Sequence, residues 1–316
     1  MTNCGTSALN LWVSAFLGPD DLIVAPHDCY GGTYRLFNTR AQKGDFNVLF
    51  VDQSDQQALS QALAKKPKLI LLETPSNPLV RVVDIEKVCT EAKQVGALVA
   101  VDNTFLTPVF QKPLELGADF VIHSTTKYIN GHSDVIGGVI VTKTEEHAEE
   151  LAWWGNCIGA TGTPFDSYMT LRGIRTLGAR MKVHEESSAQ ILRYLQDQEL
   201  VSTIYHPSLP DHPGHEIAKK QQSGFGSMLS FELAGSFEQL KVFVGALELF
   251  SLAESLGGVE SLICHPASMT HRAMGEAALA EAGVSQLLLR LSVGLEDTED
   301  LISDLEQAFI KAKESI

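Results

Sequence analysis

Residues 123–132 read His-Ser-Thr-Thr-Lys-Tyr-Ile-Asn-Gly-His and place one lysine, Lys127, among hydroxyl side chains. They follow the apolar run Phe-Val-Ile at 120–122, and an earlier apolar run at 98–101 ends in Asp102. Both runs have the length and the content of apolar, β-branched residues that are typical of buried strands. Because the carboxyl ends of parallel strands meet at one edge of a sheet, we expect Lys127 and Asp102 to lie close together there.

A lysine and a carboxylate in this arrangement are typical of a site for pyridoxal phosphate (PLP). The cofactor requires an amine for a Schiff base, a carboxylate for its ring nitrogen and hydroxyl groups for its phosphate. Lys127, Asp102, Ser124 and Thr126 carry these groups. The alternatives are a solvated lysine at a strand end and an aspartate that only caps a helix or a turn. The combination of the four residues after buried strands favours PLP.

Gly5 and Thr6 predict a further part of the phosphate site. Residues 3–7 read Asn-Cys-Gly-Thr-Ser, a glycine turn that leads into an apolar helical segment at 8–16. The free N–H groups and the dipole of a helix N-terminus attract anions. The alternative for these two residues is ordinary helix capping.

Three more side chains stand where strands are expected to end or to carry a buried charge. Tyr30 follows the run Leu22–Pro26 and would stack on the cofactor ring, unless it is a core or loop tyrosine. Asn77 follows the apolar run Leu69–Glu73 and lies between two prolines. It would form a hydrogen bond with the hydroxyl group of the cofactor ring, unless it is only a turn residue. Arg290 interrupts an apolar strand; it would bind a substrate α-carboxylate as a fork, unless it forms a structural ion pair.

The first half of the chain alternates short apolar runs with amphipathic helical segments such as 56–64 and 84–95. Strands that are apolar on both faces and alternate with helices predict a mainly parallel sheet covered on both sides. The expected strands are Leu22–Pro26, 48–52, Leu69–Glu73, Leu98–Asp102, 120–123 and 137–142.

The second half has a different pattern, which predicts a smaller α+β domain. We expect a large PLP-binding domain at 1–185 and a smaller domain at 186–316. The strands and helices expected in this half are the helices 183–197, 237–249 and 301–313 and the strands 227–233 and 287–293.

Composition excludes several classes of function. The net charge is −15, so the chain is a poor candidate for binding nucleic acid or an anionic membrane. Its apolar runs are shorter than the roughly 18–20 residues that cross a bilayer, and its first residues carry no secretory signal. The five cysteines have no zinc-like spacing and predict free thiols in the cytoplasm. The histidines match no standard metal site, and we expect no metal.

Taken together, these segments resemble the PLP-dependent enzymes of Cys/Met metabolism, a family of synthases, lyases and sulfhydrylases. The resemblance implies a PLP-dependent transferase of fold type I, similar to aspartate aminotransferase, with a mainly parallel seven-stranded sheet. It also implies PLP as the cofactor and a homotetramer. The most specific matching segments are 73–78, 101–105, 123–134, 252–262 and 289–294.

Within the family, the chain is most similar to the bacterial cystathionine γ-synthase branch. The resemblance implies a γ-replacement in methionine biosynthesis by transsulfuration, in which O-succinylhomoserine or another O-acylhomoserine and cysteine give cystathionine. Lys127 and Tyr30 would move protons, and Glu254 and Ser255 would lie near the substrate. The alternatives are a cystathionine or methionine lyase with the same site, and an inactive subunit. The runs that carry this similarity are 25–32, 48–52, 151–154 and 205–210.

The sequence departs from the family pattern before Thr2. Members of the family carry several tens of residues there, with a Tyr-x-Arg-x-x-Asn-Pro-Thr type motif whose Tyr and Arg reach the cofactor phosphate of a neighbouring subunit. That motif is missing from the sequence. For the chain as written, an N-terminally truncated large domain, this implies weaker PLP retention, weaker assembly and low or absent activity.

Overall fold

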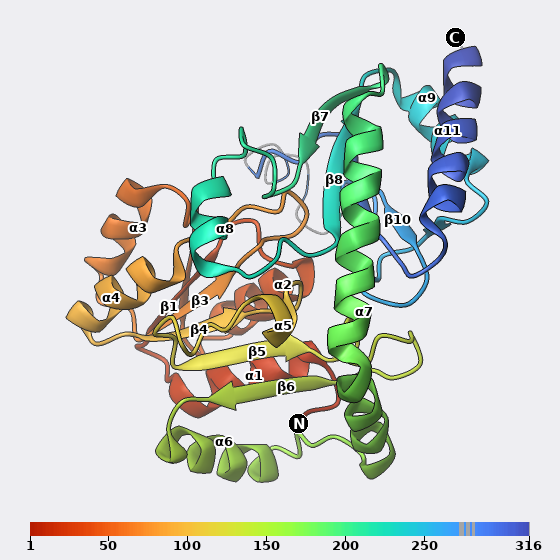
Figure 1. Cartoon of the computed structure of the whole chain (residues 1–316). Coiled ribbons are helices and arrows are strands. Elements are labelled where there is room, and N and C mark those ends of the chain that lie inside the picture. The colour runs from red at the N-terminus through yellow and green to blue at the C-terminus, as the bar shows by residue number, and fades with distance from the viewer. Residues whose placement is uncertain (272–274, 276–278, 280–281, 316) are drawn as a thin grey trace.

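The larger of two sheets occupies the lower left of Figure 1, which shows a computed structural model that describes residues 1–271, 275, 279 and 282–315. Within these residues the sheet has six strands in the order β2-β1-β3-β4-β5-β6. All neighbouring pairs are parallel except β5 with β6, so the predicted mainly parallel sheet is confirmed. The strands are β1 (Leu22–Pro26), β2 (Asn47–Val51), β3 (Leu69–Glu73), β4 (Leu98–Asp102), β5 (Phe120–Ser124) and β6 (Gly138–Thr142).

The seventh strand that was expected is reduced to a single bridge in the described part of the chain. Thr2 pairs antiparallel with Gly138 of β6: Thr2 N donates to Gly138 O at 2.8 Å, and Gly138 N donates to Thr2 O at 3.0 Å. One residue pair does not form a strand, so the expected count of seven is wrong by this strand. Gly138 allows the approach, because a Cβ there would lie 2.3 Å from the carbonyl oxygen of Cys4.

Helices cover both faces of this sheet. Successive residues of a strand point to opposite faces, so Ile23 packs with α1, α2 and α6, whereas Val24 packs with α3 and α4. Both faces are therefore buried, as the apolar strand sequences predicted. The helices of this half are α1 (Gly5–Phe16), α2 (Gly31–Gln42), α3 (Gln56–Leu63), α4 (Ile85–Val95), α5 (Thr107–Phe110) and α6 (Glu145–Cys157).

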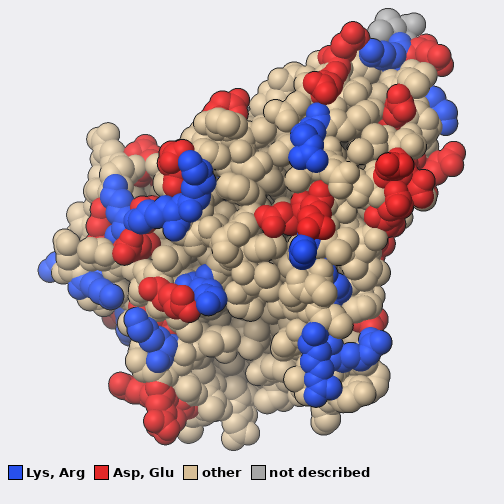
Figure 2. Space-filling model, in the orientation of Figure 1, with Lys and Arg blue, Asp and Glu red and all other residues tan. Residues whose placement is uncertain are grey.

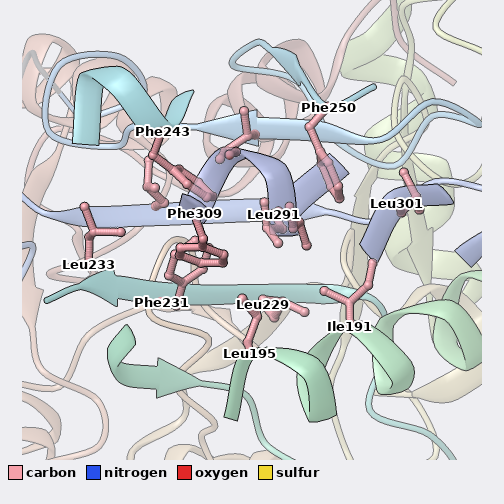
Figure 3. Close-up of a cluster of buried hydrophobic side chains, with 14 of the residues drawn as sticks. Ile191, Leu195, Leu229, Phe231, Leu233, Phe243, Phe250, Leu291, Leu301 and Phe309 are labelled. Atoms are coloured by element: carbon pink, nitrogen blue, oxygen red, sulfur yellow. The ribbon is translucent and has the colours of Figure 1, made fainter. Parts of the chain in front are cut away.

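The smaller sheet has five strands within the described residues, in the order β7-β8-β11-β10-β9, and only β10 with β9 is parallel. Its core is aromatic: Phe243 and Phe309 lie 4.5 Å apart between ring centroids, with Phe231 beside them (Figure 3). The predicted smaller α+β fold is observed. The elements are β7 (Val201–Tyr205), α8 (His215–Gln221), β8 (Met228–Leu233), α9 (Phe237–Ala246), β9 (Ser251–Leu252), β10 (Leu262–Cys264), β11 (Leu288–Ser292) and α11 (Thr298–Glu314).

One long helix, α7 (Pro164–Gln196), runs from the larger sheet to the smaller one (Figure 1). The sequence predicted its C-terminal half, 183–197, but not its first half. Gly173, which disfavours a helix by sequence alone, is there because the Ile129 carbonyl oxygen would lie 2.4 Å from a Cβ. The predicted domain boundary at 185 falls within this helix and stays a prediction.

Acidic and basic side chains are interspersed on the face shown in Figure 2. Across the described residues, every helix is too short or too polar to cross a bilayer. In the same part of the chain, no three His, Cys, Asp or Glu side chains gather as a metal site would require.

Candidate active site

A cavity of about 360 Å³ opens at the carboxyl edge of the larger sheet. Strands β3, β4 and β5 end there, so the prediction that Lys127 and Asp102 share this edge is confirmed. Every candidate residue from the sequence lines this cavity. These residues are Gly5, Thr6, Tyr30, Asn77, Asp102, Ser124, Thr126, Lys127, Glu254, Ser255 and Arg290.

Lys127 has the surroundings of a nucleophilic amine. Its Nζ donates to Ser255 Oγ at 3.0 Å, and among the described residues it has no carboxylate within ion-pair distance. Burial, helped by the positive charge of Arg290, lowers the pKa of Lys127 to about 8. The structure does not contain the alternative of a freely solvated lysine at a strand end, because the amine is partly buried and contacts Ser255.

The turn that carries Lys127 is fixed by neighbouring groups. Lys127 N donates to Ser124 O at 3.2 Å, and Gly131 N donates to Lys127 O at 2.8 Å. From α7, Arg180 Nη1 donates to the carbonyl oxygen of Tyr128 at 2.6 Å. The guanidinium thus ties the long helix to the residue directly after the lysine, which holds the amine at the cavity.

Asp102 is the last residue of β4, and only one of its two carboxylate oxygens accepts hydrogen bonds from described groups. Its Oδ1 accepts from Thr104 N at 3.0 Å and from Thr104 Oγ1 at 2.5 Å. Thr104 Oγ1 also accepts from Ser124 N at 2.9 Å, so one hydroxyl joins the ends of β4 and β5. Burial raises the pKa of Asp102, and among the described residues no lysine or arginine pairs with it. Such a carboxylate is suited to a positively charged ligand nitrogen.

The N-terminus of α1 lies against the end of β5. A Cβ on Gly5 would lie 2.9 Å from the Ser124 Cβ, so glycine is required for this approach. Cys4 Sγ caps the helix by accepting from Ser7 N at 3.2 Å. The Thr126 hydroxyl donates to Gly137 O at 3.2 Å, so its proton is used within the protein. The helix N-terminus lies beside Ser124 at the cavity; the phosphate roles of Gly5, Thr6, Ser124 and Thr126 stay predictions.

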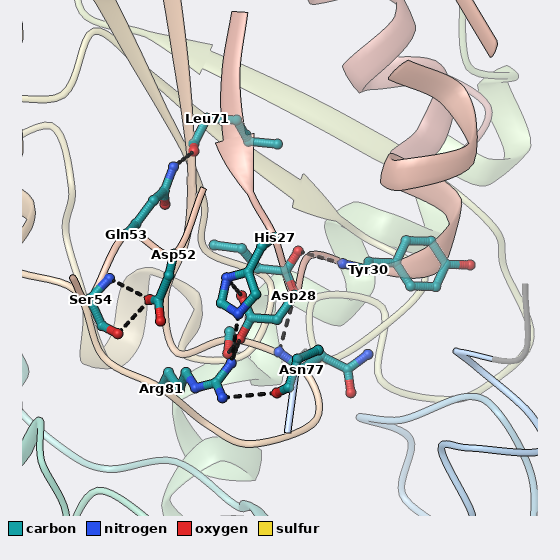
Figure 4. Close-up of polar contacts among 12 residues, drawn as sticks. His27, Asp28, Tyr30, Asp52, Gln53, Ser54, Leu71, Asn77 and Arg81 are labelled. Atoms are coloured by element: carbon teal, nitrogen blue, oxygen red, sulfur yellow. Dashed lines mark hydrogen bonds and ion pairs between the residues drawn. The ribbon is translucent and has the colours of Figure 1, made fainter. Parts of the chain in front are cut away.

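Tyr30 and Asn77 both line the cavity, and both are labelled in Figure 4. Tyr30 is 46% exposed, and its ring lies over Gly32, where a Cβ would meet Tyr30 Cε1 at 2.4 Å. It is therefore not a core tyrosine. Asn77 is buried, and its Oδ1 accepts from Arg290 Nη1 at 2.9 Å. Asn77 is thus more than a turn residue, since it orients the arginine.

Arg290 is 2% exposed, yet it has no ion-pair partner among the described residues. Its Nη2 donates to the carbonyl oxygens of Glu254 at 3.0 Å and Ser255 at 2.9 Å. Its Nε is buried without a hydrogen-bond partner among the described groups. The alternative of a structural ion pair is not what the structure contains. A guanidinium held only by neutral acceptors beside a cavity is suited to an anionic ligand.

Sequence reasoning assigned no role to two residues of this site. Glu73 ends β3 and stands beside Asp102 in the sheet register, and Thr104 joins Asp102 to Ser124. The sequence contained a signal for both residues. Glu73 is the last residue of an apolar run, just as Asp102 is the last residue of another, and the hydroxyl residue Thr104 follows two positions after Asp102.

These residues fit PLP. Lys127 would hold the cofactor covalently, Asp102 would face its ring nitrogen, and the N-terminus of α1 would face its phosphate. The observation that carries this fit is chemical. A lysine of lowered pKa, the half-buried carboxylate of Asp102 and the buried carboxylate of Glu73 line one cavity, and neither carboxylate has a cation partner among the described residues. The cavity volume of about 360 Å³ is also in the range of small-molecule sites.

Comparisons with known proteins agree with this chemistry. A family model described as Cys/Met metabolism PLP-dependent enzyme matches residues 1–310. The chain is 60% identical to cystathionine γ-synthase of Escherichia coli (strain K12) over 309 residues, which are 98% of this chain and 80% of that protein. It is 46% identical to cystathionine γ-lyase of Bacillus subtilis (strain 168) over 91% of this chain and 76% of that protein.

Solved structures give the same result for the fold. Cystathionine γ-synthase from Xanthomonas oryzae pv. oryzae, in complex with cystathionine, matches with a TM-score of 0.98 and 54% identity, over 100% of this chain and 81% of that chain. The expected PLP-dependent transferase fold, fold type I, and the expected cofactor are both confirmed. The chain belongs to the family of Cys/Met metabolism PLP-dependent enzymes.

Proposed function

We propose that this chain catalyses a γ-replacement in which an O-acylhomoserine, typically O-succinylhomoserine, and cysteine give cystathionine and a free carboxylic acid. The bond from Cγ to the acyl oxygen breaks, a bond from Cγ to the cysteine sulfur forms, and the thiol proton balances the released acid. One observation carries the proposal: Lys127 and Arg290 meet at the same segment, Glu254–Ser255, in a chain 60% identical to a protein named cystathionine γ-synthase.

Arg290 binds the substrate's α-carboxylate in this proposal. Its two terminal nitrogens are already oriented by Asn77 and by the carbonyl oxygens of Glu254 and Ser255. Because these partners are neutral, the positive charge remains available to a carboxylate. The substrate amine is then held near Lys127, and Glu254 and Ser255 lie beside the bound molecule.

Lys127 moves the proton at the substrate's Cα. When bound, PLP supplies an electron sink that stabilises negative charge at that carbon. A pKa of about 8 suits an amine that both takes and returns a proton near neutral pH. Ser255 Oγ, 3.0 Å from Nζ, orients the amine. Tyr30, on the cavity wall, is the second candidate base, and Asp102 keeps the proton on the cofactor's ring nitrogen.

The test is a product assay with purified protein and PLP, run on O-succinylhomoserine with and without cysteine and, separately, on cystathionine. We expect cystathionine when cysteine is present and less 2-oxobutyrate than cystathionine. Release of 2-oxoacid from cystathionine, without cystathionine formation from O-succinylhomoserine, would overturn the proposal in favour of the lyase alternative. Relatives named cystathionine γ-lyase and β-lyase, at 46% and 47% identity, make this comparison necessary.

A homo-oligomer, tetrameric as in the family, is part of the proposal. Large apolar side chains are exposed at intervals of three along the start of α7: Phe165, Tyr168, Leu171 and Ile174. These four side chains spread over about half of the helix circumference. Exposed apolar side chains of this size are suited to burial against a second copy of the chain. Light scattering after gel filtration tests the oligomeric state, and a monomer would contradict the proposal.

The five unpaired cysteines support a cytoplasmic location.

A further inference from the structure

Glu73 is a buried carboxylate that links two walls of the cavity. It is 8% exposed and ends β3 in register with Asp102 of β4. Its Oε2 accepts from the backbone N–H of Tyr30 at 3.0 Å, and its Oε1 accepts from the backbone N–H of Asn77 at 3.3 Å. One carboxylate thus holds the backbone at two residues that come from different strand ends.

Glu73 anchors the N–H side of both residues, and the carbonyl oxygen of Asn77 also lies 3.1 Å from His271 Nε2. Tyr30 precedes Gly31 and Gly32, which restrain the backbone little, and as the N-cap residue of α2 it makes no side-chain cap bond. Asn77 orients Arg290 through its side chain, so any shift of its backbone moves the guanidinium. Among the described residues, the Glu73 carboxylate accepts hydrogen bonds from the backbone N–H groups of both Tyr30 and Asn77.

We propose that Glu73 is a positioning residue, whose carboxylate fixes Tyr30 and Asn77 so that the aromatic wall and the Arg290 fork face one ligand in a set geometry. The inference rests on the proposed function, because only a ligand bound between Tyr30 and Arg290 gives their relative position a consequence.

A carboxylate is needed for this role and an amide does not replace it. Glu73 uses one oxygen for each N–H group, whereas glutamine has one acceptor oxygen and an NH₂ group that would face a second donor. The charge is costly here: burial raises the pKa of Glu73 well above its ordinary range, and the neighbouring charge of Asp102 adds to the rise. The two backbone N–H bonds are what favours the charged form, and no cation pairs with Glu73 among the described residues, which is consistent with a site role.

The experiment compares PLP-saturated wild type with Glu73→Gln. The readouts are the visible circular dichroism of the bound cofactor, the Kd for PLP, and kcat and KM for the amino-acid substrate. We expect PLP still fixed on Lys127 by borohydride, a changed visible dichroism, and KM raised about tenfold, as the loss of one good hydrogen-bonded orientation would cause. Unchanged dichroism and unchanged KM would overturn the proposal.

Two further variants keep the result interpretable. Glu73→Asp retains the charge but is one methylene shorter, and we expect the same changes at smaller size; it replaces the glutamine variant if that variant does not fold. Asp304→Asn is the matched control, because Asp304 is also buried and also holds backbone N–H groups, but in the smaller domain. If Asp304→Asn altered the cofactor dichroism as much as Glu73→Gln, the effect would be general destabilisation, and the proposal would fail.

The two proposals fail separately. If wild type makes no cystathionine but Glu73→Gln still changes the cofactor dichroism and the Kd for PLP, only the proposed function falls. If wild type makes cystathionine and Glu73→Gln leaves all readouts unchanged, only the role of Glu73 falls.

Discussion

The two halves of the molecule treat buried charge in different ways. In the smaller domain, the carboxylate of Asp304 accepts from the backbone N–H groups of Glu248, Leu249 and Phe250 at 2.8–3.1 Å. At the cavity edge of the larger sheet, Lys127, Asp102 and Arg290 have no ion-pair partner among the described residues. Asp304 is thus satisfied by three backbone N–H groups, and Glu73 by two, whereas Lys127, Asp102 and Arg290 keep their charges without an oppositely charged partner among the described residues.

The difference separates groups that serve the fold from groups that serve a ligand. Leaving a buried charge without a partner costs several kcal/mol, so a structure retains it only where something else compensates. In the smaller domain the protein itself compensates, through three backbone N–H groups. At the cavity, a cofactor with a phosphate and a ring nitrogen, and a substrate with a carboxylate, would do so.

Lys127→Ala tests the comparison with the largest effect. Removing the amine takes away both the covalent attachment of PLP and the base, so we expect turnover to fall by at least about 10⁴-fold, the upper range for an acid–base residue. The measurement is cystathionine formation at saturating substrates. Retained activity would remove Lys127 from the site, while unchanged thermal stability of the variant would show that the lysine does not support the fold.

Asp304→Asn should do the opposite, and cost about 3 kcal/mol of unfolding free energy with kcat and KM per folded molecule unchanged. The NH₂ group of asparagine cannot accept, so at least one of the three backbone N–H groups loses its acceptor, and the others lose a charged one. Urea denaturation measures the loss. A stable variant with altered kinetics would show that the smaller domain also tunes the site.

Arg290→Lys should raise KM for the amino-acid substrate by roughly 10- to 100-fold, because a bidentate fork becomes a point charge. We expect a smaller change in kcat, since Lys127 and Asp102 stay in place. Steady-state kinetics at varied substrate concentration separate the two parameters. Arg40→Lys, at a surface pair with Asp45 away from the cavity, is the matched control. An unchanged KM would count against carboxylate binding.

Much of this site followed from the sequence because strand ends are local signals. The runs that end at Asp102 and just before Ser124 are apolar on both faces, and a parallel sheet brings such ends to one edge. Arg290 is also a local signal, because a charged residue inside an apolar strand can be recognised from the sequence alone. The family resemblance supplied the fold type, the cofactor and the reaction.

Other features depend on contacts between distant segments, which no local pattern encodes. The two N–H groups that Glu73 binds belong to Tyr30 and Asn77, and Tyr30 lies 43 positions away in the sequence. The first half of α7 contains Gly173, which reads as a helix breaker until the Ile129 carbonyl oxygen is placed against it. The seventh strand was implied by resemblance, and in the described residues it is one bridge at Thr2.

Lys127→Met gives the smallest effect and the most direct test of the contrast between the halves. Burial lowers the pKa of Lys127 from 10.5 to about 8, so the charged form is disfavoured in the folded protein without PLP. Between these values the unfolded chain binds more protons, and wild-type stability therefore rises with pH in that window. Below pH 8 the cost is fully present, and methionine, similar in size and uncharged, removes it.

We therefore expect PLP-free Lys127→Met to be more stable than PLP-free wild type by about 1 kcal/mol at pH 7, with the gain shrinking as pH rises from about 8 through 10.5. Urea denaturation at pH 7 and pH 10 measures both differences. Asp304→Asn is the control, because its effect comes from lost hydrogen bonds to backbone N–H groups, so its loss of stability should not change between the two pH values. A gain for Lys127→Met that is equal at both pH values would come from packing alone, and the cavity lysine would then carry no electrostatic cost for function to offset.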